Sequence, residues 1–397
     1  MTTTINNEHK KLNVPNLRFP EFQGEWEKCK LGDYGKVVTG NTPPTKDIEN
    51  YENGTYLWAS PADLGTTKSV AETKTMLSAI GFSKTRPLPK GSVLVTCIGS
   101  TIGKTGMATK EMSTNQQINS IVVNDNNDNE FVYYAIQSAF PRYLSSIAVQ
   151  AVPIISKSSF ELLPNKRPCL QEQKKIGKFI SLLDERIATQ NKIIDKLQSL
   201  IKGISNKLLY TGEGIQVRLG TILNERSERT KVNNQHEVLS STVNGLFSQR
   251  EYFSKDIASK NNIGYKIIRL HDVVLSPQNL WMGNINYNDR FDIGIVSPSY
   301  KVFSITDNYD KRYIAALLKT NRALYDYMLV SEQGASIVRR NLNSEAFEQL
   351  VFKIPSIAKQ REIGNAIWSL KALLEVENMI IASYQSQKQY LLRQMFI

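Results

Sequence analysis

The segment GSTIGKTG, from Gly99 to Gly106, has the residue types of a loop that binds phosphate groups. The P-loop of nucleotide-binding proteins cradles phosphates with backbone amides, and it requires a glycine five residues before its Gly-Lys-Thr triplet. In this chain that position is Ile98, and Gly106 would interrupt the helix that should follow. The segment is therefore predicted to be a flexible basic loop and not a nucleotide site.

Two other stretches resemble catalytic motifs without meeting their requirements. Asp63, Glu72 and Lys74 have the residue types of a metal-dependent nuclease, but scattered acids meet such a spacing often by chance. The stretch NTPPT, which begins at Asn41, resembles the Asn-Pro-Pro-aromatic motif of amino-methyltransferases, yet it has threonine in the first proline place and no aromatic end. The three cysteines and three histidines are scattered, which argues against zinc and disulfides. We expect no catalytic residue, no metal site and no cofactor.

The charge balance favours a polyanionic partner. Lys and Arg number 49 against 37 Asp and Glu, which gives a net charge of +12 and a pI of about 9.3. Such an excess is typical of proteins that bind nucleic acid, although a generally basic soluble protein has it as well. No run approaches 18 apolar residues, and the polar start MTTTINNEHK is not a signal peptide. We expect a soluble protein of the reducing cytoplasm with no membrane partner.

A ten-residue phrase occurs twice in the chain. PCLQEQKKIG begins at Pro168 and PSIAKQREIG begins at Pro355, 187 residues later. Each phrase opens a stripe of apolar residues at alternating steps of three and four, which predicts the seam of a coiled coil. The seam residues are Ile176, Ile180, Leu183, Ile187, Ile194 and Leu197 in the first copy and Ile363, Ile367, Leu370, Leu374, Ile381 and Tyr384 in the second.

The alternative for each stripe is an amphipathic helix that lies on a globular core. Two stripes of the same length and pattern favour the packing of the two helices on each other. The polar gaps in the stripes, Gln190 and Glu377, fall at the same heptad site, where a buried polar residue would set the register at some cost in stability.

The segments before the two helices also correspond. CKLGDYGKVVTG (Cys29–Gly40) resembles VRLGTILNERSE (Val217–Glu228), and SFELL (Ser159–Leu163) resembles AFEQL (Ala346–Leu350). Short Val- and Ile-rich runs and a helical patch lie between them in each half. One unit is therefore predicted to occur twice in tandem.

The predicted fold class is α+β, with two pseudo-symmetric α/β-type domains, each followed by a long helix. Residues 1–165 form the first domain, of which residues 1–25 are a candidate N-terminal cap for the helix pair. Residues 166–210 form the first helix, residues 211–352 the second domain and residues 353–397 the second helix.

The opening VPNLRFPEFQGEWEKCKLGD (Val14–Asp33) and the duplicated phrase resemble the specificity subunits of bacterial type I restriction–modification enzymes. The resemblance covers essentially the whole chain, although LRFPEF has no counterpart before the second domain. It implies two target-recognition domains, held apart by an antiparallel pair of helices, each of which reads one half of a bipartite site in double-stranded DNA. It also implies a non-catalytic subunit that docks two methyltransferase subunits and, for cleavage, two ATP-dependent restriction subunits.

The helix length bounds the DNA site. A helix from Gln173 to Leu209 would span about 55 Å at 1.5 Å per residue. Domains at opposite ends of such a rod would be separated by up to ~16 base pairs at 3.4 Å each. We expect a site in two short parts with a non-specific gap, ~12–16 base pairs overall.

Bases are read by Arg, Lys, Asn or Gln on exposed loops, while Ser, Thr and main-chain groups fix phosphates. We expect the pair Arg339–Arg340 to contact phosphates. Trp281 could stack on DNA or pack in the core, and we prefer packing in the core. The other candidates are Thr39, Gly40, Asn41, Thr42, Ser100, Thr101, Lys104, Asn115, Gln116 and Gln117 in the first domain and Arg226, Arg229, Gln278, Asn279 and Asn284 in the second.

Two other functions remain open at this point. One is a recognition module with its own nuclease or methyltransferase activity, which would show turnover with S-adenosylmethionine or Mg²⁺ as the purified chain. The other is a stand-alone regulator that binds a bipartite DNA site, and it would bind specifically without any partner.

Overall fold

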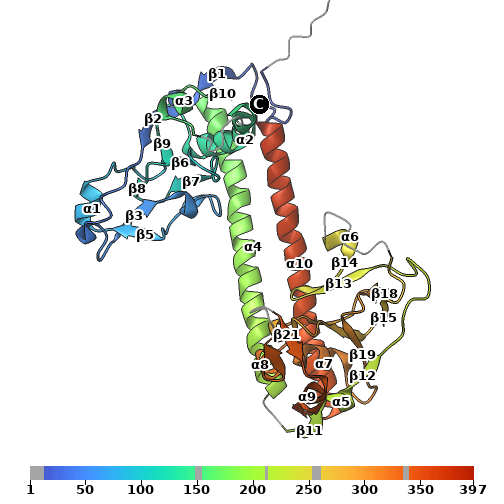
Figure 1. The fold of residues 1–397 in the computed structure, drawn as a ribbon. Coiled ribbons are helices and arrows are strands. Elements are labelled where there is room, and N and C mark those ends of the chain that lie inside the picture. Colours follow the sequence, from blue (N-terminus) through green and yellow to red (C-terminus); the bar gives the residue numbers. More distant parts are fainter. Residues whose placement is uncertain (1–12, 148–153, 211–212, 253–260, 334–338) are drawn as a thin grey trace, which may run out of the picture. The chain divides into compact units, whose positions relative to one another are not determined.

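The computed structural model describes residues 13–147, 154–210, 213–252, 261–333 and 339–397. The chain divides into two compact units. Unit 1 comprises Met1–Asn191 and Met379–Ile397, and unit 2 comprises Lys192–Asn378. Two long helices, α4 (Leu170–Tyr210) and α10 (Ile357–Met395), each contribute to both units and are drawn in green and red in Figure 1. Unit 1 holds the first part of α4 with the last part of α10, which is the order of an antiparallel pair.

Unit 1 contains a five-stranded sheet of order β2-β9-β6-β7-β4, a three-stranded sheet of order β5-β3-β8 and the pair β1-β10. Its strands are β1 (Glu27–Lys30), β2 (Gly35–Thr39), β3 (Tyr56–Ala59), β4 (Ser69–Val70), β5 (Thr75–Leu77), β6 (Val93–Thr96), β7 (Thr105–Ala108), β8 (Ser113–Thr114), β9 (Ile118–Val123) and β10 (Pro164–Arg167). Its other helices are η1 (Leu31–Tyr34), η2 (Ile48–Asn50), η3 (Pro61–Asp63), α1 (Ala79–Ser83), α2 (Asn129–Ile147) and α3 (Lys157–Glu161).

Unit 2 contains a four-stranded sheet of order β12-β19-β16-β17 and four two-stranded pairs. Its strands are β11 (Ile215–Arg218), β12 (Leu223–Arg226), β13 (Leu239–Thr242), β14 (Gly245–Ser248), β15 (Lys266–Arg269), β16 (Asp272–Leu275), β17 (Ile285–Tyr287), β18 (Ile293–Val296), β19 (Lys301–Ile305), β20 (Ser331–Gln333), β21 (Arg340–Leu342) and β22 (Val351–Ile354). Its other helices are α5 (Leu219–Ile222), α6 (Gln249–Tyr252), η4 (Leu280–Met282), α7 (Lys311–Leu317), α8 (Asn321–Leu329) and α9 (Ser344–Gln349).

The two units share one framework. The antiparallel order β2-β9-β6-β7 of unit 1 corresponds to β12-β19-β16-β17 of unit 2, and the pair β1-β10 corresponds to β11-β22. The Leu-Gly step of the matching segments sits alike in both units: the backbone nitrogen of Leu31 donates to Leu163 at 3.0 Å, and that of Leu219 donates to Leu350 at 2.8 Å. The duplication and the mixed fold class predicted from the sequence are confirmed.

The central strand of each sheet is buried on both faces. In β6, Val93 and Val95 belong to the core that contains α2 and the start of α4, while Leu94 belongs to a second core on the other face. In β16, Val273 and Val274 divide in the same way between two cores. Because successive side chains of a strand point to opposite faces, each sheet separates a core against the long helices from a second core.

The repeated phrase attaches each domain to its long helix through a buried glutamine. The side chain of Gln173 donates to the carbonyl of Pro168 at 3.0 Å and accepts from the backbone nitrogen of Asp128 at 3.1 Å. In unit 2, Gln360 donates to Pro355 at 2.9 Å and accepts from the backbone nitrogen of Asp310 at 2.9 Å.

The two aspartates in turn cap helices of their domains. The Asp128 carboxylate accepts from the backbone nitrogen of Phe131 at 2.9 Å at the start of α2, and Asp310 accepts from Tyr313 at 2.8 Å at the start of α7. A side-chain acceptor before the first turn satisfies an otherwise unpaired helical N–H group. The phrase therefore fixes the start of a domain helix to the start of a long helix in each unit.

The glycine that ends the phrase permits a close approach of the same elements. A Cβ atom at Gly177 would lie 2.5 Å from Asp128 Oδ1 and 2.8 Å from the backbone nitrogen of Phe131. A Cβ atom at Gly364 would lie 2.6 Å from Asp310 Oδ1 and 2.9 Å from the backbone nitrogen of Tyr313. Both contacts are far shorter than van der Waals distances, so a larger residue would push the domain helix away.

The predicted seam lies inward along both helices. In unit 1, Ile176 and Ile180 of α4 share a core with Leu391 and Met395 of α10, and Asp184 forms an ion pair with Lys388 at 2.7 Å. In unit 2, Leu209 of α4 shares a core with Ile363 and Ile367 of α10. Of the seam residues, Ile176, Ile180, Leu183, Ile194, Ile363, Ile367 and Ile381 are buried, and Ile187, Leu197, Leu370, Leu374 and Tyr384 are half-buried.

The segment before β1 bonds both long helices of unit 1. The guanidinium of Arg18 donates two hydrogen bonds, at 2.8 and 2.7 Å, to the buried carboxylate of Glu172 in α4. Trp26 Nε1 also donates to Glu172, at 3.3 Å. The backbone nitrogen of Leu17 donates to the carbonyl of Gln394 in α10 at 2.9 Å. Residues 13–26 therefore join the first turn of α4 to the last turns of α10, and residues 1–12 of the expected cap lie outside the described residues.

Candidate nucleic-acid interface

Two predicted loops of unit 1 lie side by side. The strand β2 ends at Thr39 opposite the start of β9, and Thr39 Oγ1 donates to Asn119 Oδ1 at 2.7 Å. Beyond this pair, the backbone nitrogen of Asn41 donates to Thr114 at 2.9 Å, and Thr42 Oγ1 donates to the side-chain oxygen of Gln116. The predicted residues 39–42 and 115–117 thus form one polar platform at the edge of the five-stranded sheet.

Two residues of the platform shape its backbone. A Cβ atom at Gly40 would lie 2.2 Å from the carbonyl oxygen of Thr114 and 2.3 Å from that of Asn115, so the two loops meet only because a glycine stands there. The buried side chain of Asn115 bonds both the side chain and the backbone nitrogen of Gln117, at 3.0 and 3.1 Å. Gln116 lies exposed between them and is the outward-facing amide of the platform.

The glycine-flanked loop approaches the platform at one end. The backbone nitrogen of Cys97 donates to the carbonyl of Gln117 at 2.7 Å, which brings the end of β6 beside the platform. The loop then turns through Gly99 and Gly103, both at a φ of 90°. Ser100 and Lys104 are exposed and Thr101 is half-buried, and the side chain of Lys104 lies beside Gly65. The loop is a tight hairpin and carries the Ser100 hydroxyl outward.

An arginine absent from the predicted residues also borders the platform. The exposed guanidinium of Arg86 donates to the carbonyl of Thr39 at 2.7 Å, and the side chain of Asn41 donates to the carbonyl of Lys84 at 2.8 Å. The segment between α1 and β6 is therefore part of the same surface. In the sequence, Arg86 is a single basic residue before a proline, and only the long-range contact to Thr39 distinguishes it.

In unit 2, two predicted arginines are held by their own domain. Arg226 Nε lies 3.0 Å from the buried Asp272 Oδ1. Burial raises the pKa of Asp272, and the backbone N–H of Arg269 and the charge of Arg226 oppose that rise. The guanidinium of Arg229 donates to the carbonyl of Gly264 at 2.9 Å. Both arginines stabilise the domain, so their charges are partly engaged before any ligand arrives.

The predicted loop of unit 2 after β16 divides into inner and outer residues. Asn284 is buried, and its side chain bonds both the hydroxyl and the carbonyl of Ser241, at 2.7 and 3.0 Å. Trp281 is half-buried under the guanidinium of Arg340, whose centre lies 5.0 Å from the ring. Arg340 also bonds Gln278 through its backbone nitrogen, at 3.1 Å. Trp281 is therefore partly covered by Arg340, and Asn279 in the same loop is half-buried as well.

Two residues of this region face outward. Gln278 and Arg339 are exposed, and the backbone bond between Arg340 and the Gln278 carbonyl places them near each other. They form the outward-facing amide and cation of unit 2, as Gln116 and Arg86 do in unit 1. The residue Val338, next to this pair, lies outside the described residues.

The described residues contain no group of three or more His, Cys, Asp or Glu side chains arranged to hold a metal ion. Within those same ranges, no helix combines the length and the apolar composition needed to cross a bilayer. Organised polar side chains occur in the loop clusters just described and in a pocket of unit 2.

The sequence is similar to one class of known proteins. The family model of the type I restriction modification DNA specificity domain matches residues 23–199. The MjaIX specificity subunit of Methanocaldococcus jannaschii is 29% identical over 182 residues, which cover 44% of this chain and 42% of that protein. The HindI specificity subunit of Haemophilus influenzae is 28% identical over 187 residues, with coverage of 44% and 40%. The chain thus aligns with less than half of the length of these relatives.

Solved structures share the fold over nearly the whole chain. The S subunit of a type I restriction-modification system from M. genitalium superposes with a TM-score of 0.62, covering 97% of this chain and 99% of that one at 16% identity. A chain from a structure of type I R-M complex assembly and conformational transition reaches a TM-score of 0.54, with coverage of 94% and 97% at 14% identity. Residues 23–199 therefore match the type I restriction modification DNA specificity domain, and the chain is similar in sequence to type I specificity subunits and in fold to a solved S subunit.

Proposed function

We propose that this protein is the DNA sequence-specificity subunit of a type I restriction–modification complex. The observation that carries the proposal is the duplicated framework, in which each unit has the same strand order and the same Gln and Gly contacts to a long helix. A protein with two equivalent domains on one helix pair is suited to a DNA site with two separate parts. The named relatives, all specificity subunits, support the same role.

Each unit reads one half of a bipartite site in double-stranded DNA. The exposed Gln116 and Arg86 of unit 1 and Gln278 and Arg339 of unit 2 have the donor and acceptor groups that base edges and phosphates require. The surrounding hydrogen bonds hold these loops in place before DNA binds. Preorganised loops favour discrimination because little ordering remains to be done at binding.

The helix pair sets the gap between the half-sites. A helix of the length of α4 rises about 60 Å at 1.5 Å per residue, or about 18 base pairs at 3.4 Å each, so a site of ~12–16 base pairs overall fits within its length. Insertion of one heptad in α4 and one in α10 lengthens the gap and leaves both half-sequences unchanged. The domain boundaries at residues 165, 210 and 352 are the natural points for exchanging recognition domains between relatives.

We assign the chemistry to partner subunits. Two methyltransferase subunits dock on the helix pair and modify DNA, and two ATP-dependent restriction subunits complete the complex for cleavage in the cytoplasm. The chain itself contributes recognition without catalysis and holds no cofactor. This division follows the names of the relatives, which describe specificity subunits of restriction enzymes.

The test is the modification pattern that the chain directs. The chain is expressed with its methyltransferase subunits in cells that lack other DNA modification, and the modified adenines are mapped by sequencing. We expect one motif with two defined parts and a fixed gap, absent when either subunit is omitted. A continuous motif, or methylation by the purified chain with S-adenosylmethionine, would overturn the proposal. Tight specific binding by the chain without any partner would favour a stand-alone regulator.

A further inference from the structure

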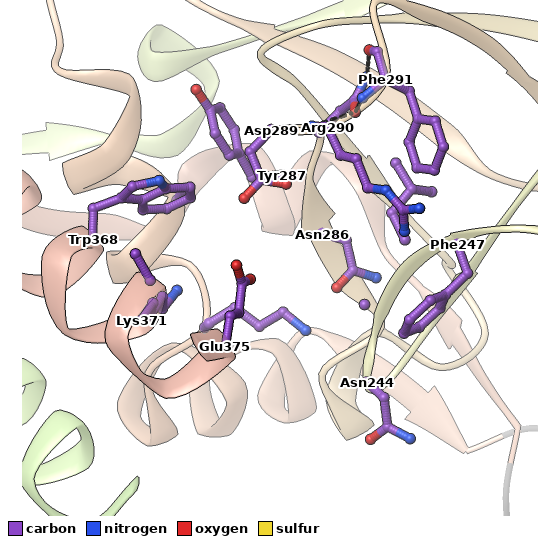
Figure 2. Close-up of a pocket in the computed structure, with 16 residues that line it drawn as sticks. Asn244, Phe247, Asn286, Tyr287, Asp289, Arg290, Phe291, Trp368, Lys371 and Glu375 are labelled. Carbon is purple, nitrogen blue, oxygen red and sulfur yellow. Dashed lines mark hydrogen bonds between the residues drawn. The ribbon is translucent and has the colours of Figure 1, made fainter. Parts of the chain in front are cut away.

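Unit 2 contains a pocket that the loops assigned to base reading do not use. It has a volume of about 510 Å³ and lies between α10 and the strands β14 and β17. Figure 2 shows Trp368, Lys371 and Glu375 projecting from α10 on one side. The opposite wall carries Asn244, Phe247, Asn286 and Arg290. A hollow with aromatic, amide and cationic walls can hold a small polar ligand.

Charged side chains of both signs line the pocket. Arg290, Lys319 and Lys371 line it, against the two carboxylates of Asp289 and Glu375. Arg290 lies beside Glu251 at 2.8 Å, so its charge is already paired. In the part of the chain that the structure describes, neither lysine forms an ion pair with a carboxylate.

The two lysines are held in place by uncharged groups. Lys319 Nζ donates to the carbonyls of Val243 and Gly283, at 3.1 and 3.0 Å. Lys371 Nζ lies 5.1 Å from the centre of the Trp368 ring. Carbonyl dipoles and an aromatic face attract a cation without neutralising it. None of these contacts is an ion pair, and both lysine side chains are half-buried.

The two charges disfavour each other. Burial, and after it the charge of Lys371, lower the pKa of Lys319 to about 8. Burial also lowers the pKa of Lys371, which Asp289 and Glu375 oppose from a distance. A bound anion would interact favourably with both lysines and remove this repulsion.

In the corresponding cleft of unit 1, the charged side chains pair with one another. Asp184 stands 187 residues before Lys371, where it forms an ion pair with Lys388 at 2.7 Å and accepts from Tyr134 at 2.6 Å. Lys68 in the same cleft bonds Glu130 at 2.8 Å. That cleft has three cations and three carboxylates among its lining residues. Among the described residues, unit 1 therefore places a carboxylate, Asp184, at the position where unit 2 has Lys371.

We propose that Lys319 and Lys371 form a phosphate-binding site, occupied in the working protein by a phosphodiester of the DNA backbone. The DNA part of this inference rests on the proposed function. Lysines hold phosphates as point charges, and phosphate contacts fix the register of a protein on the duplex without reading bases. The site therefore positions the recognition loops of unit 2 relative to the DNA.

The first test measures the salt dependence of DNA binding. The full chain with its methyltransferase subunits is titrated with its DNA site at several salt concentrations, as wild type and as Lys371→Met. A plot of log K against log salt has a negative slope, and loss of one phosphate contact reduces the magnitude of that slope by about 0.9. Lys359→Met is the matched control, because Lys359 is exposed on the same helix and pairs with Glu362 at 2.8 Å. We expect the control to keep the wild-type slope and both variants to keep the modified motif. An unchanged slope in a folded Lys371→Met protein would contradict the proposal that a DNA phosphodiester occupies the site.

The second test does not depend on the DNA proposal. The full chain is titrated with inorganic phosphate against chloride at equal ionic strength, and tryptophan fluorescence is recorded for the wild type and for Trp368→Phe. We expect a change that Trp368→Phe and Lys371→Met abolish and Lys359→Met retains. If this fluorescence change occurs but the protein shows no sequence-specific DNA binding, phosphate binding in the pocket is supported and the proposed function is contradicted. If it occurs while the salt slope is insensitive to Lys371, the ligand is a free phosphate and not DNA. No change in either experiment overturns the site.

Discussion

The side-chain oxygen of Gln173, in the first turn of α4, accepts a hydrogen bond at 3.1 Å from the backbone nitrogen of Asp128, the residue before α2. The side chain of Gln173 is buried, and its nitrogen donates to the carbonyl of Pro168 at 3.0 Å. One amide thus ties the helix start, the preceding proline and the domain helix together. Since Gln360 repeats these contacts with Asp310 and Pro355, the same joint occurs in both units.

Replacement of this glutamine is predicted to weaken the joint of one unit. Gln173→Ala leaves the buried carbonyl of Pro168 and the half-buried N–H group of Asp128 without this partner, which costs about 1–3 kcal/mol. We expect the free energy of unfolding of the chain to fall by this amount, measured by chemical denaturation. Lys174→Ala is the control, because Lys174 is the exposed neighbour of Gln173 on the same helix. Equal stability of the two variants would show that the glutamine does not secure the joint.

The repeated phrase illustrates what the sequence could and could not predict. Periodicity located both helices and their seam, since Ile176 and Ile363 recur at the steps that a packed helix requires. The partners of the phrase were not predictable, because Asp128 and Asp310 lie 45 and 50 residues before Gln173 and Gln360. No local pattern specifies a contact at such separations.

The sequence indicated which loops make up the candidate interface, but not which of their side chains face outward. The platform around Gln116 forms from two loops that were both expected to read DNA. Asn284 has the same residue type and the same kind of loop, yet it is buried against Ser241 of β13. The direction of a loop side chain depends on its neighbours from other strands, and Arg86 was missed for the same reason.

Two glycines of the long helix α4, Gly203 and Gly177, are predicted to have opposite effects on stability when each is replaced by alanine. Alanine is favoured over glycine in a helix by about 1 kcal/mol, and a Cβ atom at Gly203 meets nothing within 4 Å. Gly203→Ala should therefore stabilise the chain. Gly177→Ala places a Cβ atom 2.8 Å from the backbone nitrogen of Phe131, so we expect it to destabilise the chain by about 1–3 kcal/mol. Thermal unfolding of both variants decides this, and a stabilising Gly177→Ala would refute the close joint.

The pKa of Lys319 predicts a pH-dependent stability. Its folded-state pKa is lowered to about 8 from an ordinary value of 10.5, so between these values the unfolded chain binds more protons. Stability contributed by this group therefore rises with pH from about 8 to about 10.5, at up to ~1.4 kcal/mol for each unit of pKa difference. We expect Lys319→Met to lack this rise relative to wild type when unfolding is measured from pH 7 to pH 10. Lys359→Met should follow the wild-type curve, and a Lys319→Met curve parallel to it would contradict the prediction.

The outward amides of the two units are predicted to govern different halves of the DNA motif. Gln116 is exposed on the platform of unit 1 and Gln278 is exposed beside Arg339 in unit 2. A bidentate amide contact to adenine discriminates against the wrong base by about 1–3 kcal/mol. Gln116→Ala should therefore relax one or two positions in one half of the methylated motif, and Gln278→Ala should relax positions in the other half.

The readout is the map of modified adenines that each variant directs together with its methyltransferase subunits. The gap between the half-sequences should stay the same in both variants, because α4 and α10 keep their lengths. Ser83→Ala provides a control, since Ser83 is exposed and bonds only the carbonyl of Ile80, at 2.8 Å, among the contacts described for it. Relaxation of the same half by both glutamine variants would contradict the assignment of one half-site to each unit. A changed gap would place Gln116 or Gln278 in the spacer mechanism instead of in base reading.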